Sequence, residues 1–177
     1  MKKILKMLVA LVAIVMAVSC MDKSEGNTTW TKRYDGVMTT TNTDSGDVSE
    51  DNASVIIYQG DITEPYMNIT IEGVRFVPMM PDVDFLVENV QFSLSTTDDP
   101  NDPLYHAWVF NKGSVVPKSG GVPREEYTMH NFQGNLTDNT LRLDFDVNFR
   151  GVIYHASFGD KAELRSRYSE KYKSLKL

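Results

Sequence analysis

Residues 141–150, LRLDFDVNFR, alternate apolar and polar side chains without a break. Successive side chains on a β-strand point to opposite faces, so a period of two predicts an antiparallel strand with one buried and one solvated face. The same alternation occurs in residues 67–71 and again in residues 152–158. In residues 104–110, it would place Leu104, His106, Trp108 and Phe110 on one face of a strand.

Residues 83–94 contain a change of phase in this pattern. The apolar positions are odd in the first half and even in the second: Val83, Phe85 and Val87, then Val90, Phe92 and Leu94. A single regular strand would expose one of the two sets, whereas a β-bulge near Glu88 and Asn89 keeps both inside. Such a bend is typical of a strand that wraps around a closed barrel.

Polar segments rich in Gly, Pro, Asp and Asn separate these runs, at residues 43–51, 98–103, 111–124 and 137–139. The longest of them, residues 111–124, is predicted to be a loop. We count about eight to ten short strand patterns and no helical period before residue 160. The expected fold is therefore all-β, with residues 30–159 forming an antiparallel barrel of about eight strands.

The last segment, residues 160–177, breaks the strand pattern. Asp160 and Glu163 match a helix capping box, and four apolar residues then follow at helical spacing: Leu164, Tyr168, Tyr172 and Leu175. We predict a C-terminal amphipathic α-helix. Its apolar stripe would pack on the barrel wall, or its basic residues would contact an anionic membrane or partner.

The first residues have the features of an exported chain. Lys2, Lys3 and Lys6 precede an apolar run of 12 residues, 7–18, which is too short to span a bilayer because spanning takes about 20. Small residues then lead to Cys20, in an arrangement that resembles a lipoprotein cleavage site. We predict a signal peptide at residues 1–19 and a lipid, such as palmitate, on Cys20. An ordinary secretory signal is the alternative.

A lipidated tether, residues 20–29, would then join the barrel to a membrane in the cell envelope. Met21 follows Cys20, and by resemblance to Gram-negative lipoproteins the lack of an acidic residue there favours the outer membrane. Which face of that membrane would carry the protein stays open. Cys20 is the only cysteine of the chain, so no disulfide can stabilise the fold.

Charge is divided unevenly along the chain, whose net charge is −6. Residues 20–159 carry 21 acidic and 9 basic side chains, whereas residues 160–177 carry 3 acidic and 6 basic ones. An acidic body repels phosphate backbones, so nucleic-acid binding is not expected. Solubility is the preferred explanation of the acidity.

Short motifs resemble those of a family of bacterial lipoproteins with a calycin-like β-barrel. They are Tyr34-Asp35-Gly36, ITIEGVRF at residues 69–76, Met80-Pro81, and NFQGNLTDNTLRLDF at residues 131–145. The resemblance covers about residues 30–158 and implies a lipocalin-like barrel, without implying an activity. The chain lacks the Gly-x-Trp of true lipocalins in its first strand.

Catalytic motifs are not recognisable in the chain. It has three histidines, His106, His130 and His155, but no Gly-x-Ser-x-Gly elbow and no His-Glu-x-x-His pair. The acidic turns at residues 44–51 and 98–102 lack the ligand spacing of an EF-hand. We therefore predict no catalytic residues, no metal site and no cofactor.

A ligand site, if the barrel has one, is predicted around residues 76–81, FVPMMP. Its flexible methionines suit adaptable apolar contacts, but a plug for the barrel end is the preferred interpretation of them. The predicted contacts are Phe76, Met79, Met80, His106, Trp108 and Phe110, with residues 111–124 as a lid. His106 would be either a core histidine or a polar group in the cavity.

Two functions are consistent with this sequence. The first is a membrane-anchored, non-enzymatic module that binds a small apolar ligand or a partner protein of the envelope. The second is a structural or assembly subunit of an envelope complex, with a solid barrel core. A filled barrel interior would favour the second function.

Overall fold

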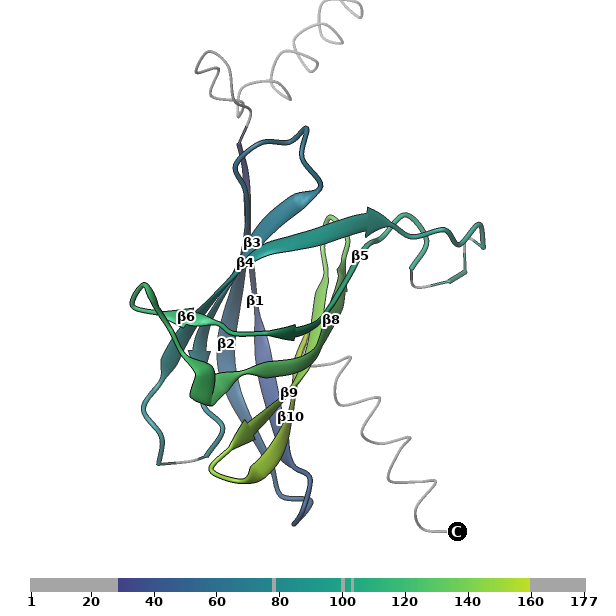
Figure 1. Cartoon of the computed structure of the whole chain (residues 1–177). Helices are drawn as coiled ribbons and strands as arrows, with labels where there is room; N and C mark the ends of the chain where they lie inside the picture. Colours follow the sequence, from purple (N-terminus) through teal and green to yellow (C-terminus); the bar gives the residue numbers. More distant parts are fainter. Residues whose placement is uncertain (1–28, 78, 100, 103, 160–177) are drawn as a thin grey trace, which may run out of the picture.

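The computed structural model describes residues 29–77, 79–99, 101–102 and 104–159 (Figure 1). Eight long strands follow one another along this part of the chain: β1 Trp30–Asn42, β2 Val48–Gln59, β3 Tyr66–Val74, β4 Val83–Leu94, β5 Trp108–Val115, β8 Met129–Leu136, β9 Leu141–Phe149 and β10 Val152–Gly159. Two short strands, β6 Lys118–Ser119 and β7 Val122–Pro123, and a 3₁₀ turn at Glu125–Tyr127 lie between β5 and β8.

The eight long strands close into an antiparallel barrel. Their order is β3-β2-β1-β10-β9-β8-β5-β4, and β4 pairs back with β3 to complete the circle. The short β6–β7 ribbon is attached to β4 through Leu86 and Lys118. The predicted all-β fold, an antiparallel barrel of eight strands, is confirmed, and it is compatible with a calycin-like fold. The predicted signal peptide, tether and C-terminal helix lie outside the described residues.

Alternating side chains fill much of the barrel interior. In β9, Leu141, Leu143, Phe145 and Val147 are buried as predicted, because their side chains point inward. One aromatic cluster joins Phe76, Phe85, Tyr127, Phe149 and Tyr154, with ring centroids 5.2–6.3 Å apart. A second runs from Phe92 through Phe110 and Phe132 to Phe145. These rings make a packed core without disulfides.

The phase change in β4 is a β-bulge, as the sequence predicts. Met67 pairs with Val90 and Ile69 with Val87, so β4 has one more residue between these pairs than β3. The extra residue is accommodated at Asn89, whose φ is 54°, and the Asn89 backbone N–H donates to Asn68 Oδ1 at 3.0 Å. Leu94 is the exception, because it is 51% exposed instead of buried.

The segment from residue 104 to residue 124 differs from the prediction. Residues 104–106 lie in a turn, and His106 has a φ of 57°, so β5 begins only at Trp108. Residues 108–115 then pair with β4 and β8, and residues 118–123 form the β6–β7 ribbon. The predicted long loop, residues 111–124, is thus mostly strand.

The barrel has two different ends. One end, which we call the open end, is formed by the start of β1, the β2–β3 and β4–β5 connections, and the β8–β9 turn (Figure 1). The opposite end, which we call the far end, carries the β1–β2, β3–β4 and β9–β10 turns. In an antiparallel barrel, successive turns alternate between the two ends.

Candidate functional site: a pocket at the open end

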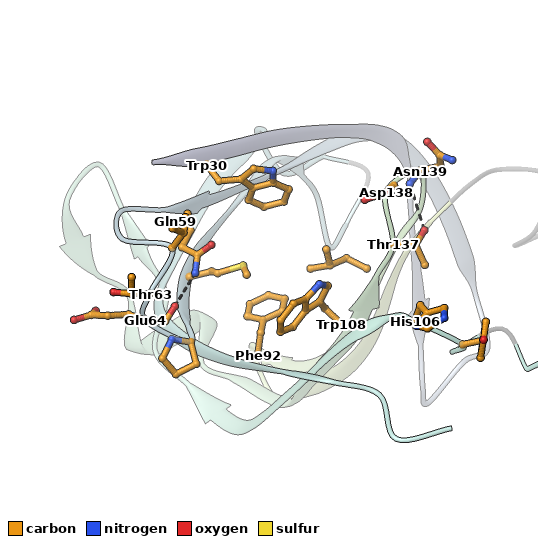
Figure 2. Close-up of a pocket in the computed structure, with 15 residues that line it drawn as sticks. Trp30, Gln59, Thr63, Glu64, Phe92, His106, Trp108, Thr137, Asp138 and Asn139 are labelled. Carbon is orange, nitrogen blue, oxygen red and sulfur yellow. Dashed lines mark hydrogen bonds between the residues drawn. The ribbon is translucent and has the colours of Figure 1, made fainter. Parts of the chain in front are cut away.

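A pocket of about 820 Å³ occupies the open end of the barrel. Its apolar walls come from six different parts of the chain: Trp30, Ile62, Met67, Phe92, Trp108 and Leu136. Figure 2 shows Trp30 and Trp108 projecting into the opening from different walls, with Trp108 beside Phe92. The pocket therefore has an aromatic mouth above the packed core.

Strand register brings these side chains together. Trp108 pairs with Leu94 on one side and with Leu136 on the other, which places the indole at the junction of β4, β5 and β8. Trp30 pairs with Gln59 at the first position of β1. Both tryptophans thus lie at strand ends, where the barrel wall stops and side chains can bend over the opening.

Hydrogen bonds hold the rim of the pocket. The Gln59 side-chain amide donates to the Glu64 carbonyl oxygen at 2.6 Å, which braces the β2–β3 connection (Figure 2). The Tyr34 hydroxyl donates to the Thr137 carbonyl oxygen at 3.0 Å, which ties β1 to the β8–β9 turn. Burial raises the pKa of Tyr34 to about 12, with a smaller contribution from the Asp138 carboxylate. The hydroxyl is thereby kept in its donating, neutral form.

Charged groups at the pocket are acidic. Glu64 and Asp138 contribute to the described wall, which includes no lysine or arginine. Lys32 lies further along β1, and its ammonium nitrogen is 5.4 Å from the centroid of the Tyr34 ring. An apolar ligand without a negative charge fits such a wall best.

The structure places the predicted site residues in two groups. Trp108 and His106 line the pocket. Phe110 does not reach it, but its ring centroid lies 4.7 Å from that of Phe92, so it supports the pocket floor. Phe76, Met79 and Met80 belong to the far end, because the β3–β4 turn lies there.

The predicted roles of these residues need two corrections. His106 is exposed at the rim of the pocket, so the core interpretation of this histidine is wrong. Phe76 and Met80 are buried at 2% and 8% exposure, as expected of a plug, whereas Met79 is 97% exposed. Phe76 and Met80 thus help to fill the far end, and neither they nor Met79 line the pocket.

A polar row on the outer wall joins three adjacent strands. His130 and His155 are the cross-strand neighbours of Asp146 in β8 and β10. His155 Nδ1 lies 2.8 Å from Asp146 Oδ1, and His130 Nδ1 lies 2.7 Å from Ser114 Oγ. Burial opposes ionisation of Asp146, but hydrogen bonds from Asn131 and His155 outweigh it and lower the pKa of the carboxyl group.

This row does not form a recognisable catalytic or metal site. Ser114 and Asp146 approach different histidines, so no serine, histidine and aspartate are linked in one chain of hydrogen bonds. Among the described residues, no group of three or more His, Cys, Asp or Glu side chains could hold a metal ion.

Sequence reasoning missed several pocket residues, among them Trp30, Met67 and Leu136 of the apolar wall. Their inward direction follows from the strand period, but the period does not say where the packed core stops. The only signal in the sequence for the position of the pocket is the large size of the tryptophan side chains. Both tryptophans of the chain lie at the ends of strands.

No protein-family model matches this sequence, and comparison with curated proteins and with solved structures finds no match either. In the part of the chain that the structure describes, no helix is long and apolar enough to cross a membrane.

Proposed function

We propose that this protein is a non-enzymatic binding module for a small apolar ligand, held at the outer membrane by a lipid on Cys20. The pocket at the open end carries the proposal. Its volume of about 820 Å³ falls within the range of roughly 300–1,000 Å³ that is usual for small-molecule sites. Its wall combines aromatic, thioether and aliphatic groups with a few polar groups at the rim.

The wall also favours binding energetically. Trp108 is 42% exposed, so a ligand that covers its indole removes apolar surface from water. The underlying side chains, Phe92 and Met67, are 2% and 8% exposed and are already packed. The floor is therefore preformed, and binding does not require the core to rearrange.

A neutral fluorescent probe, diphenylhexatriene, tests this function. The chain is the expected mature one, residues 20–177, with Cys20→Ser to keep it free of lipid. We expect saturable binding to the wild-type pocket, and we expect Trp108→Ala to weaken it about tenfold, or ~1.4 kcal/mol. Met79→Ala is the matched control, because Met79 is apolar and 97% exposed at the far end. Equal binding by both variants would show adsorption to the surface and contradict the proposal.

A second function, a structural or assembly subunit of an envelope complex, is supported by the packed half of the barrel. Phe85, Phe145 and Phe158 are at most 2% exposed, so the barrel is solid below the pocket. The absence of saturable probe binding would favour this function. Such a subunit would recruit a partner through the basic residues of the predicted C-terminal helix, residues 160–177, which lies outside the described residues.

A further inference from the structure

Exposed apolar side chains are concentrated at the open end of the barrel. Of the eleven large apolar residues that the structure shows at 37% exposure or more, six lie there: Tyr58, Ile62, Tyr66, Leu94, Tyr105 and Trp108. All four aromatic residues of the eleven belong to this group. The five others, at the far end and on the β5–β8 segment, are aliphatic or methionine.

This distribution is typical of a surface that contacts lipid head groups. Tyrosine and tryptophan are enriched at membrane–water interfaces because each combines an apolar ring with a polar tip. An apolar patch rimmed by polar residues marks an interaction site when it exceeds what a soluble surface usually exposes. Tyr105 and Trp108 line the pocket, and Tyr58 and Tyr66 lie near the open-end termini of β2 and β3, so a flat apolar boundary could be contacted by several of these rings together.

The part of the chain before β1 fits the same orientation. β1 begins at Trp30 at the open end, and Cys20 precedes it by ten residues. Ten residues span at most about 33–36 Å when fully extended. A lipid on Cys20, as the proposed function holds, would keep the open end within that distance of the bilayer.

We propose that the open end of the barrel docks on a zwitterionic lipid bilayer, with Tyr66, Leu94, Tyr105 and Trp108 at the level of the head groups. The pocket mouth then faces the membrane, and an apolar ligand passes between bilayer and pocket without crossing water. Residues 20–159 carry twelve more acidic than basic side chains, so anionic lipids repel this part of the protein.

Intrinsic fluorescence tests the docking directly, because the only two tryptophans, Trp30 and Trp108, both line the pocket at this end. The chain of residues 20–177 with Cys20→Ser is titrated with phosphatidylcholine vesicles. We expect the tryptophan emission to shift to the blue. We also expect it to be quenched when the lipids carry bromine near the head-group end of their acyl chains. Replacing about a third of the lipid by phosphatidylglycerol should weaken binding, and added salt should reduce that difference.

Two double variants separate docking from filling of the pocket. Tyr66 and Leu94 do not line the pocket, so Tyr66→Ser with Leu94→Asn should lower vesicle binding about fivefold to tenfold and leave diphenylhexatriene binding unchanged. The control is the double variant Val122→Asn with Ile153→Ser. Val122 is 55% exposed and Ile153 is 47% exposed, which is close to the 51% of Leu94 and the 46% of Tyr66. Melting temperatures, measured for both variants, test whether each of them still folds.

Docking is contradicted if neither tryptophan is quenched, or if the two double variants lose vesicle binding equally. Tighter binding to anionic vesicles contradicts the choice of lipid. Because this chain has no acyl group, the outcome does not depend on lipidation of Cys20. Failure of diphenylhexatriene binding with vesicle binding intact removes the ligand function alone, and the docking surface stands.

Discussion

The hydroxyl group of Tyr34 joins two parts of the barrel that no strand pairing connects. Its bond to the Thr137 carbonyl oxygen links β1 to the β8–β9 turn, and its side chain is 7% exposed. We expect Tyr34→Phe to lower the free energy of unfolding by about 1 kcal/mol at pH 7, because one partly buried hydrogen bond is lost. Chemical denaturation measures this difference.

The same variant has a defined pH dependence. The pKa of Tyr34 is raised to about 12, above the value of about 10 in an unfolded chain. Its stabilisation is therefore fully present below pH 10 and is lost as the pH rises towards 12. The difference between wild type and Tyr34→Phe should shrink over that window. Tyr58→Phe, at an exposed position of β2, serves as the control. If the difference in free energy of unfolding between wild type and Tyr34→Phe stayed constant up to pH 12, the argument would be contradicted.

Among the elements, β4 depends on one backbone conformation. Asn89 adopts a φ of 54° at the bulge, which asparagine tolerates and β-branched residues do not. We expect Asn89→Val to lower the free energy of unfolding by about 1–2 kcal/mol, measured by urea denaturation. Asn89→Gly keeps the conformation and should cost less.

Gln91→Val provides the matched control for this strand. Gln91 is exposed and pairs with Tyr66 in the regular part of β4, where a β-branched residue is well tolerated. If Asn89→Val and Gln91→Val were equally stable, the bulge would not depend on residue 89.

The sequence predicts correctly those strands in which apolar and polar residues alternate without interruption, or in which this alternation changes phase once. Residues 141–149 and the bulge near Asn89 followed from the apolar positions alone. Leu104 and His106 were expected to share a strand with Trp108 and Phe110, because the turn before β5 has the same spacing of apolar residues as a strand. The positive φ of His106 breaks the alternation, and no feature of its neighbours indicates this.

The predicted site combined residues from opposite ends of the barrel, and the reason is topological. Successive antiparallel turns lie at opposite ends, so the β3–β4 turn with Met79 and Met80 cannot meet Trp108, which follows the β4–β5 connection. Counting the turns would have separated the two groups. The depth at which the aromatic core ends depends on how the side chains pack. The alternation of apolar and polar residues along a strand does not encode this depth.

At the scale of the whole molecule, the proposal assumes that Cys20 carries a lipid. Cells expressing the chain and fed labelled palmitate should label the wild type, because only a thiol at this position can accept the diacylglycerol. Cys20→Ser should remain unlabelled, whereas Trp108→Ala, with an intact Cys20, should be labelled normally. Equal labelling of wild type and Cys20→Ser would remove the anchor and the outer-membrane assignment.

β1 occupies an interior place in the sheet, between β2 and β10. It pairs with β2 at twelve positions, from Trp30 to Thr41, and with β10 at six. Its hydrogen bonds run perpendicular to the strand, so a pull applied at Trp30 along the strand strains these bonds in shear, all together. Peeling, in which bonds break one after another, would need a sideways force. The first strand can therefore sustain mechanical tension from the preceding chain while the barrel remains closed.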